Sequence, residues 1–375
     1  MREESVSRCA RSTVEIESSC TAESRRIAAS TSVSSARRKR PAKPCAPTIV
    51  RRICASVALV DAVDTYLSTY PESPVVLDVL GTVDGAAIKQ QIQQLEPATT
   101  EIFAFACSVG ATFGLLLEDG SRVALKIHKL FRDPAYFRDV QCVQGSMREA
   151  GFPAPRPVRV HGAVTVEEWI DDGVFRDAHD GDVRRAMADV LARFVELASG
   201  SGVSPRRASL TPEGELWPKP HNKLFDFEAT ASGAEWIDEI GARAAAVEKV
   251  GRAVVGHLDW AAKHVRFDSG LQPTAVYDWD SVTTEFEPVV AGQAAASFTY
   301  TEELNSAVER WPTPDESSAF LADYDRARGS AFAAAERRTA GAACVYLLAY
   351  AARCGHAIGA DLADSSLRDH ARAFL

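Results

Sequence analysis

The sequence predicts an α+β fold with two lobes, in which a small antiparallel-sheet lobe precedes a larger helical lobe. Residues 101–129 are rich in apolar and β-branched side chains and contain Asp119-Gly120, a strong signal for a hairpin turn. After residue 171, apolar residues recur at helical spacing in several long segments. With 375 residues, of which 46% are apolar, the chain is long enough to build a core in each lobe.

The individual elements follow from local signals along the chain. A helix over residues 134–151 ends at a glycine, and a helix over 180–200 begins at an aspartate, as helix termini favour. The expected elements are a helix over 54–70, a strand over 74–80, strands within 101–129, a helix over 134–151, a strand over 163–170, helices over 180–200, 233–251, 317–332 and 336–359, and a hairpin of 265–267 with 274–277. The predicted division is a disordered basic tail over 1–52, an N-lobe over 53–170 and a C-lobe over 171–375.

Charge and composition narrow the classes of partner. The whole chain carries a net charge of -9 although its first 52 residues are basic, so the rest of the chain is acidic. An acidic body repels nucleic acid and favours cationic small molecules. We find no apolar run of the roughly 20 residues that a membrane span needs, no secretory signal and no C-x-x-C pair. These features predict a cytoplasmic protein without nucleic-acid or membrane partners, and they leave the oligomeric state open.

A strand lysine is the first candidate functional residue. In the segment RVALKI, Ala124 and Lys126 share one face of the expected strand. Lysine offers a point charge to phosphate oxygens, and a small alanine beside it leaves room for a nucleotide base. The adjacent hairpin contains Gly110 and Gly114, which suits a face that receives an adenine and its phosphates. The plain alternative is a solvent-facing strand lysine.

Two aspartates form the second candidate, in the segment VVGHLDWAAKHVRFDSGLQPTAVYDWDS. Asp259 precedes a short hairpin and Asp278 ends it, so the hairpin brings the two carboxylates near each other. Phosphoryl transfer needs one carboxylate to accept or orient the hydroxyl proton and another to hold a divalent cation. His257 is placed to brace this loop through hydrogen bonds. Either aspartate alone would more simply cap a turn.

Residues from about 80 to about 350 resemble the aminoglycoside phosphotransferase family, relatives of the protein kinases. That family has a loop of the form H-G-D-x-x-x-x-N, then a strand ending in I-D-W-E or D-x-D; here these are HLDWAAKH and YDWDS. The resemblance implies a protein-kinase-like two-lobed fold with ATP or GTP between the lobes. It implies that Asp259 is the catalytic base and that Asp278 and the residue at position 264 hold Mg²⁺. The nucleotide-binding residues are then Lys126, Ala124, Ser108, Gly110 and, in a hinge over 166–170, Glu168, Trp169 and Ile170.

The chain departs from the family pattern in three places. His264 stands where the family has asparagine, and imidazole suits softer cations such as Mn²⁺ better than Mg²⁺. The helix after Lys126 should supply a glutamate to pair with it; Asp139 or Gln141 is nearest the expected turn, and Glu149 is farther along. The segment ACSVGATFGLLL is only loosely similar to a phosphate-covering loop.

The acceptor side is less defined by the sequence. Acids on helices could bind the ammonium groups of an aminosugar, and two aromatic residues could line a pocket. Each of these residues could equally belong to a solvated helix face or a packed seam. The candidates are Glu235, Asp238, Glu239, Asp323 and Asp325, with Trp217 and His221.

We therefore predict a kinase that transfers the γ-phosphoryl group of ATP or GTP to a hydroxyl of a small molecule, with aminoglycoside-like antibiotics among the acceptors. The alternative is a catalytically impaired nucleotide-binding pseudokinase, because His264 replaces the metal-binding asparagine. A metal-dependent hydrolase built on His257, Asp259, His264 and Asp278 ranks third, since it leaves the lysine hairpin without a role.

Overall fold

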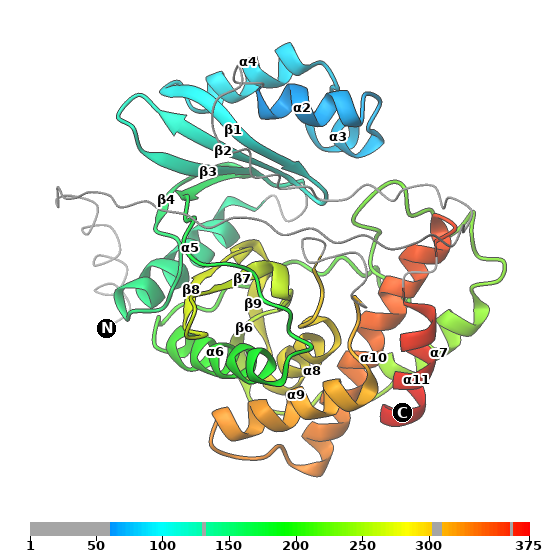
Figure 1. The fold of residues 1–375 in the computed structure, drawn as a ribbon. Coiled ribbons are helices and arrows are strands. Elements are labelled where there is room, and N and C mark those ends of the chain that lie inside the picture. Colours follow the sequence, from blue (N-terminus) through cyan, green and yellow to red (C-terminus); the bar gives the residue numbers. More distant parts are fainter. Residues whose placement is uncertain (1–60, 130–132, 302–309, 361–362) are drawn as a thin grey trace, which may run out of the picture. The chain divides into compact units, whose positions relative to one another are not determined.

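The computed structural model of the chain describes residues 61–129, 133–301, 310–360 and 363–375 (Figure 1). The chain divides into two units, Met1–Pro47 and Thr48–Leu375, and all described residues belong to the second. The predicted basic tail over 1–52 lies outside the described residues. None of the helices in the described segments has the length and apolarity that crossing a membrane requires.

The first lobe is a five-stranded antiparallel sheet with helices on both faces (Figure 1). The strand order is β1-β2-β3-β5-β4, so the predicted hairpin of β2 and β3 forms the centre of the sheet. The elements in chain order are α2 (Ala62–Thr69), α3 (Pro74–Leu80), α4 (Gly85–Leu95), β1 (Thr99–Cys107), β2 (Ala111–Leu117), β3 (Arg122–Ile127), α5 (Pro134–Glu149), β4 (Pro157–His161) and β5 (Val164–Glu168).

Pro74–Leu80 is helix α3, and the prediction of a strand there is wrong. The run of valine and leucine favours a strand, but the flanking residues start and stop a helix. The Ser73 side chain accepts a hydrogen bond from Val76 N–H, and proline occupies the first turn, where its missing N–H costs nothing. Gly81 ends the helix in the left-handed conformation, at φ 76°. The caps therefore decide between two structures that the apolar run alone allows.

The two faces of the sheet contribute to different cores. Helices α2, α3 and α4 cover one face and form the core of the first lobe with residues such as Ile88 and Phe113. Helix α5 lies on the other face, but its buried side chains, including Tyr136 and Val143, belong to the core of the second lobe. Helix α5 is therefore fixed to both lobes, beside the strands that will matter for the site.

The second lobe is mainly helical, with two short strand pairs that carry the two motif aspartates (Figure 1). Strand β6 pairs with β9, and β7 pairs with β8, as predicted for the hairpin. The elements are α6 (Gly181–Ser199), α7 (Glu235–Ala245), β6 (Ala253–His257), η1 (Ala262–His264), β7 (Val265–Phe267), β8 (Pro273–Val276), η2 (Trp279–Ser281), β9 (Val282–Phe286), α8 (Glu287–Ser297), α9 (Pro314–Ala327), α10 (Ala334–Ala357) and α11 (Asp364–Phe374).

The core of the second lobe holds the turns that carry the aspartates. Trp260 and Trp279 follow Asp259 and Asp278 directly and are 0% and 2% exposed. Both rings contact Phe194 of α6, with centroids 6.3 and 5.3 Å away. Both tryptophans therefore pack in the core. Because each buried tryptophan directly follows a motif aspartate, it fixes the position of that aspartate's backbone.

Helix α8 is one of six described α-helices and β-strands that sequence patterns did not predict. It is buried along nearly its whole length, so it has no polar face and no helical periodicity for a sequence pattern to reveal. The other unpredicted helices and strands are short, or they lie between segments with stronger sequence signals for secondary structure. The unpredicted elements are α4, β4, β6, β9, α8 and α11.

A close helix contact gives a prediction about stability. A Cβ atom at Gly292 in α8 would collide with the Ala340 carbonyl of α10. We expect Gly292→Ala to lower the free energy of unfolding by about 1–3 kcal/mol, the usual cost of overpacking. Gly145→Ala in α5 is the matched control: its Cβ would lie 3.6 Å from Pro157 Cγ, an ordinary contact. Urea unfolding should show that control unchanged or up to about 1 kcal/mol more stable, and equal losses would contradict the packing argument.

Candidate active site

A cavity of about 410 Å³ lies between the sheet of the first lobe and the motif turns of the second. It receives residues from the β1–β2 turn, strand β3, the segment after β5, η1 and η2. Of the residues that the sequence analysis assigned to the site, all except His257 line it. They are Ser108, Gly110, Ala124, Lys126, Glu168, Trp169, Ile170, Asp259, His264 and Asp278.

The β1–β2 turn lies against the end of β3 because residue 110 is glycine. Ser108 N–H donates to Gly110 O at 2.9 Å, which closes the turn. A Cβ atom at position 110 would lie only 2.6 Å from Ile127 O. Any other residue would push the turn away from β3 and widen this end of the cavity.

Lys126 is paired by a neighbouring strand, and the prediction of a partner in the helix over 134–151 is wrong. Lys126 Nζ lies 2.8 Å from Glu167 Oε1 of β5. Gln141 of α5 instead donates to the backbone carbonyl of Val166, at 3.3 Å. Burial lowers the pKa of Lys126, but the charges of Glu167 and Asp278 outweigh it, so the pKa is raised and the side chain stays charged.

Of the cavity-lining residues Glu168, Trp169 and Ile170, only Ile170 has a backbone N–H with no hydrogen-bond acceptor in the described part of the chain. Trp169 N–H donates to Arg122 O at 3.0 Å, and Ile170 O accepts from the Tyr277 hydroxyl at 2.8 Å. The Ile170 N–H makes no hydrogen bond to any acceptor in the described part of the chain. A planar base in the cavity could therefore bind this N–H with its edge.

Arg266 of β7 lines the same end of the cavity, and sequence reasoning missed it. Its guanidinium carbon lies 4.8 Å from the Phe175 ring centroid and 5.8 Å from that of Tyr277. Its Nη1 donates to Asp171 O at 2.8 Å, which fixes the plane. The available signal was an arginine between two apolar residues in a short strand, which places it on the opposite face from the core.

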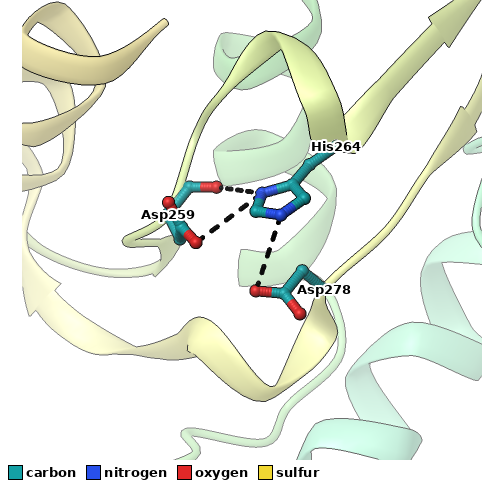
Figure 2. Close-up of side chains that lie close together, drawn as sticks. All are labelled: Asp259, His264 and Asp278. Carbon is teal, nitrogen blue, oxygen red and sulfur yellow. Dashed lines mark hydrogen bonds and ion pairs between the residues drawn. The ribbon is translucent and has the colours of Figure 1, made fainter. Parts of the chain in front are cut away.

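Asp259 and Asp278 face each other with the ring of His264 between them (Figure 2). His264 Nδ1 lies 2.8 Å from the Asp259 carbonyl oxygen, so Nδ1 carries the proton and donates. Nε2 then presents its lone pair to Asp278 Oδ2, which is 3.9 Å away. Burial lowers the pKa of His264 to about 4, so the ring is neutral near pH 7.

The Asp259 carboxylate is ionised. Burial alone would raise its pKa, but the neighbouring His264 and Lys263 hold the pKa below its usual value. Lys263 lines the cavity, with its ammonium 4.9 Å from the centroid of the Tyr300 ring. Sequence reasoning also missed Lys263, although its place between the two motif residues was a signal. An ionised carboxylate at this end of the cavity can accept a proton or a hydrogen bond.

Asp278 sits in a strained backbone conformation at the end of the hairpin. Its φ of 65° and ψ of 46° lie in the left-handed region, which only asparagine and aspartate tolerate well apart from glycine. The Ser281 hydroxyl donates to Asp278 O at 2.9 Å and closes the turn. Burial and the charge of Asp280 raise the pKa of Asp278 well above its usual value. A bound cation would relieve both causes.

Asp280, the second acid of DWD, connects the turn to the first lobe and was not assigned a role from the sequence. Its Oδ2 lies 3.0 Å from His128 Nδ1, just beyond β3. His128 Nε2 lies 2.9 Å from the Thr165 hydroxyl of β5. Burial would raise the pKa of Asp280, but the hydrogen bond from His128 outweighs this and holds the pKa far below its usual value.

His257 is a bracing residue, as the sequence suggested, but it does not reach the cavity. It is 0% exposed. Its Nε2 donates to Tyr277 O at 2.9 Å, and Nδ1 accepts from the Asp259 N–H at 3.3 Å. Burial lowers its pKa, consistent with the neutral ring that this pattern needs. His257 therefore joins the turns before both aspartates, and it cannot also be a metal ligand as the hydrolase hypothesis required.

The described residues contain one set of side chains whose geometry could hold a metal ion. One ligand atom each from Asp259, His264 and Asp278 lies within 4.8 Å of the others. Two carboxylate oxygens and a neutral imidazole nitrogen suit a divalent cation. The residues present thus fit the metal that the motifs imply.

Most acids proposed to bind an aminosugar have other partners. Asp323 pairs with Arg184 at 2.9 Å, and Arg337 contacts Asp325. Trp217 Nε1 donates to Asp238 at 2.8 Å, and the Trp217 ring packs against Tyr346. His221 bonds the Tyr350 hydroxyl at 2.8 Å, while Glu235 and Glu239 are exposed on α7. These residues serve packing and surface roles.

Comparison with known proteins identifies the fold. A scan against protein-family models found no match, and a search of curated proteins also found none. Among solved structures, the chain matches an amicoumacin kinase in complex with AMP-PNP, Ca²⁺ and Ami, with a TM-score of 0.54, 12% identity and coverage of 76% of this chain and 92% of that one.

Two further solved structures that the chain matches are also described as a phosphotransferase or a kinase. A macrolide 2'-phosphotransferase type I has a TM-score of 0.47 at 13% identity, with coverage of 76% of this chain and 97% of that one. An ethanolamine kinase from Plasmodium vivax has a TM-score of 0.46 at 11% identity, with coverage of 86% and 96%. The fold is that of the kinase-like phosphotransferases, as the amicoumacin kinase match shows, and the α+β two-lobed prediction is confirmed.

Proposed function

Because the chain has the fold of small-molecule phosphotransferases, we propose that it transfers the γ-phosphoryl group of ATP or GTP to a hydroxyl of a small molecule. One observation carries the proposal. Lys126 and a hinge-like segment line one part of a cavity, and Asp259, His264 and Asp278 converge on another. This is the distribution of charge that phosphoryl transfer uses, with cations and metal ligands around the phosphates and a carboxylate beyond them.

The first lobe, residues 53–170, would cover the nucleotide. The Ile170 N–H and the Glu168 carbonyl would meet the base edge, with Ala124 above it and Trp169 beside it. Lys126 would hold the α- and β-phosphates, under the turn of Ser108 and Gly110. The AMP-PNP in the amicoumacin kinase supports a triphosphate nucleotide as the ligand of this fold.

Asp278 and His264, from the second lobe over 171–375, would hold the divalent cation. When bound, the cation and nucleotide supply charge neutralisation and the phosphoryl group. The Ca²⁺ in the amicoumacin kinase supports a divalent cation at this site, and Mg²⁺ is the physiological candidate. An imidazole nitrogen beside a carboxylate widens the choice to Mn²⁺.

Asp259 would act as the base for the acceptor hydroxyl. Its carboxylate is ionised and lies at the cavity, with its Oδ2 3.8 Å from His264 Nδ1. His257 and His264 hold the Asp259 backbone from two directions, through its N–H and its carbonyl. These two histidines keep the carboxylate oriented before the acceptor arrives.

The histidine at the metal site gives a prediction about cation choice. We expect His264→Asn to preserve or raise transfer with Mg²⁺ and to lower the preference for Mn²⁺, because an amide oxygen replaces an imidazole nitrogen. Initial rates with each metal would measure the ratio. His161→Asn is the control, since that histidine is exposed at the end of β4 and does not line the cavity. A large loss of transfer rate with both metals in His264→Asn would show that the main role of His264 is to hold the Asp259 carbonyl.

An acceptor screen tests the function itself. ATP or GTP labelled at the γ-phosphate is offered with aminoglycosides, macrolides, amino-alcohols and sugars, and phosphorylated products are separated by mass. We expect label on one class with the wild-type protein and none with Asp259→Ala. Nucleotide binding without any transfer would favour the pseudokinase, and a product that persists in Asp259→Ala would refute the assigned base.

A further inference from the structure

We propose that Glu167 of strand β5 is the residue that positions Lys126 for the nucleotide phosphates, in place of an acid from helix α5. The inference rests on the proposed function, since it assigns the partner of the phosphate-binding lysine. It places both charges of the lysine site on strands of the sheet.

The register of the sheet brings Glu167 and Lys126 together. Strands β3 and β5 are antiparallel, with Ala124 opposite Glu167 and Lys126 opposite Thr165. Side chains alternate between faces along each strand, so these four share one face. Glu167 is therefore the diagonal neighbour of Lys126, at a distance that two long side chains span. Ala124, which lies directly opposite Glu167, is small, so the glutamate side chain can extend over it toward Lys126.

The contacts occupy both oxygens of the glutamate. Glu167 Oε1 lies 2.8 Å from Lys126 Nζ, and Glu167 Oε2 accepts from Gln144 Nε2 at 2.9 Å. The two side chains of the ion pair are only 13% and 6% exposed, which limits screening by solvent. Gln144 also donates to the Pro155 carbonyl, at 3.0 Å, so the anchor of the glutamate is itself held. Lys126 has one fixed direction in which to point.

Helix α5 supports this arrangement with an amide instead of a charge. Its buried face is apolar apart from Gln144. The helix acid Asp139 lies off that face, with Arg138 and Asp133 as its charged neighbours. The carboxylate that the family pattern predicts on the helix thus lies on strand β5, and the helix supplies the amide of Gln144. The second glutamate of the pair, Glu168, meets Arg148 of α5 at 2.9 Å and is not the partner of Lys126.

A strand-borne partner changes what the lysine depends on. Strands β3 and β5 are joined by backbone hydrogen bonds, which fix the separation of the backbones at Lys126 and Glu167, and Gln144 of α5 orients the glutamate side chain. The lysine is then placed before nucleotide binds, without a helix rearrangement. Burial alone would lower the pKa of Lys126, and among the neighbouring charges the Glu167 carboxylate opposes this effect most strongly.

The experiment compares ligands with and without phosphates. Dissociation constants for ADP and adenosine are measured by calorimetry and competition NMR for the full-length protein and for Glu167→Gln, an isosteric change. We expect ADP to bind about tenfold or more weakly while adenosine is unchanged, because a misplaced lysine affects only phosphate contacts. Unchanged adenosine affinity also shows that the variant is folded. Equal losses for both ligands, or no loss for ADP, would overturn the assignment.

Two further variants distinguish a failure of the role assigned to Glu167 from a failure of the proposed nucleotide-binding site. Asp139→Asn removes the helix carboxylate that the family pattern favours, and we expect ADP and adenosine affinities to match the wild type. A loss of ADP affinity in Asp139→Asn comparable to that in Glu167→Gln would return the role to the helix. Lys126→Ala tests the site itself: if it leaves ADP affinity unchanged, the proposed nucleotide site is wrong. If it weakens ADP and Glu167→Gln does not, only the role of Glu167 fails.

Discussion

Replacing Asp259 by alanine should lower kcat for phosphoryl transfer by about 10²–10⁴-fold, the range that a positioned general base contributes. The side chain nearest the Asp259 carboxylate is the neutral His264 ring, at 3.8 Å, and His264 keeps its hydrogen bond to the backbone carbonyl of residue 259 when the carboxylate is removed. We therefore expect the unfolding midpoint and the affinity for metal–nucleotide to stay near the wild-type values. A loss confined to kcat would place the residue at the reacting hydroxyl.

The matched control for this variant is Asp172→Ala, which removes an exposed carboxylate that does not line the cavity. Its kcat should equal that of the wild type. A loss of less than tenfold in Asp259→Ala would show that another group accepts the proton, or that none is needed. A matching rise in KM without a change in kcat would instead make Asp259 a substrate-binding residue.

Replacing Asp278 by asparagine should abolish metal-dependent binding of the triphosphate and lower transfer by about 10²-fold or more. The carboxylate is the charged ligand of the proposed cation, and asparagine removes the charge at nearly constant shape. Asparagine also tolerates the left-handed backbone at φ 65°, so the turn keeps its conformation. The measurement is nucleotide affinity with and without Mg²⁺ or Mn²⁺, together with initial transfer rates.

The stability of the same variant offers an internal check. In the wild type, burial and the charge of Asp280 disfavour the ionised form of Asp278. Removing the charge should therefore leave the free energy of unfolding of the metal-free protein unchanged or higher. Lower activity without lower stability is the pattern of a functional residue held in an unfavourable setting. A destabilised variant that still binds metal–nucleotide would contradict the assignment.

The two motif aspartates could be predicted from the sequence because their signals are local. The hairpin that separates them has a clear turn, and each aspartate lies at one end of it. The tryptophan after each aspartate is buried, and it holds the turn in place against the core. What the sequence could not give was the orientation of His264, since that depends on a bond to the Asp259 carbonyl.

The partner of Lys126 could not be predicted, because it depends on strand register. Glu167 is separated from Lys126 in the sequence by a helix and another strand, and one residue of slippage would turn it to the other face. The doubled glutamate in VEEWI was visible, but the sequence did not say which of the two would face the lysine. Arg266 and Asp280 were missed for a similar reason, since both act through residues far away in the chain.

Helix and strand assignments failed where apolar runs lacked a polar face. The segment Pro74–Leu80 has the composition of a strand, and only its end residues indicate a helix. Helix α8 is surrounded by other elements, so its sequence lacks the alternation that marks a surface helix. In both places tertiary burial removed the periodic signal on which sequence analysis relies.

The central claim is that this cavity binds a metal–triphosphate complex, and thermal unfolding with ligands tests it most directly. The series compares ATP, GTP and AMP, each with Mg²⁺, Mn²⁺ or no metal. A ligand at 100 times its dissociation constant stabilises a protein by about 2.7 kcal/mol, and each kcal/mol raises the midpoint of a domain of this size by roughly 2–4 °C. We expect a shift of several degrees with a triphosphate and metal together, and a smaller one with AMP. No shift with any nucleotide under any of these conditions would contradict the kinase and the pseudokinase alike.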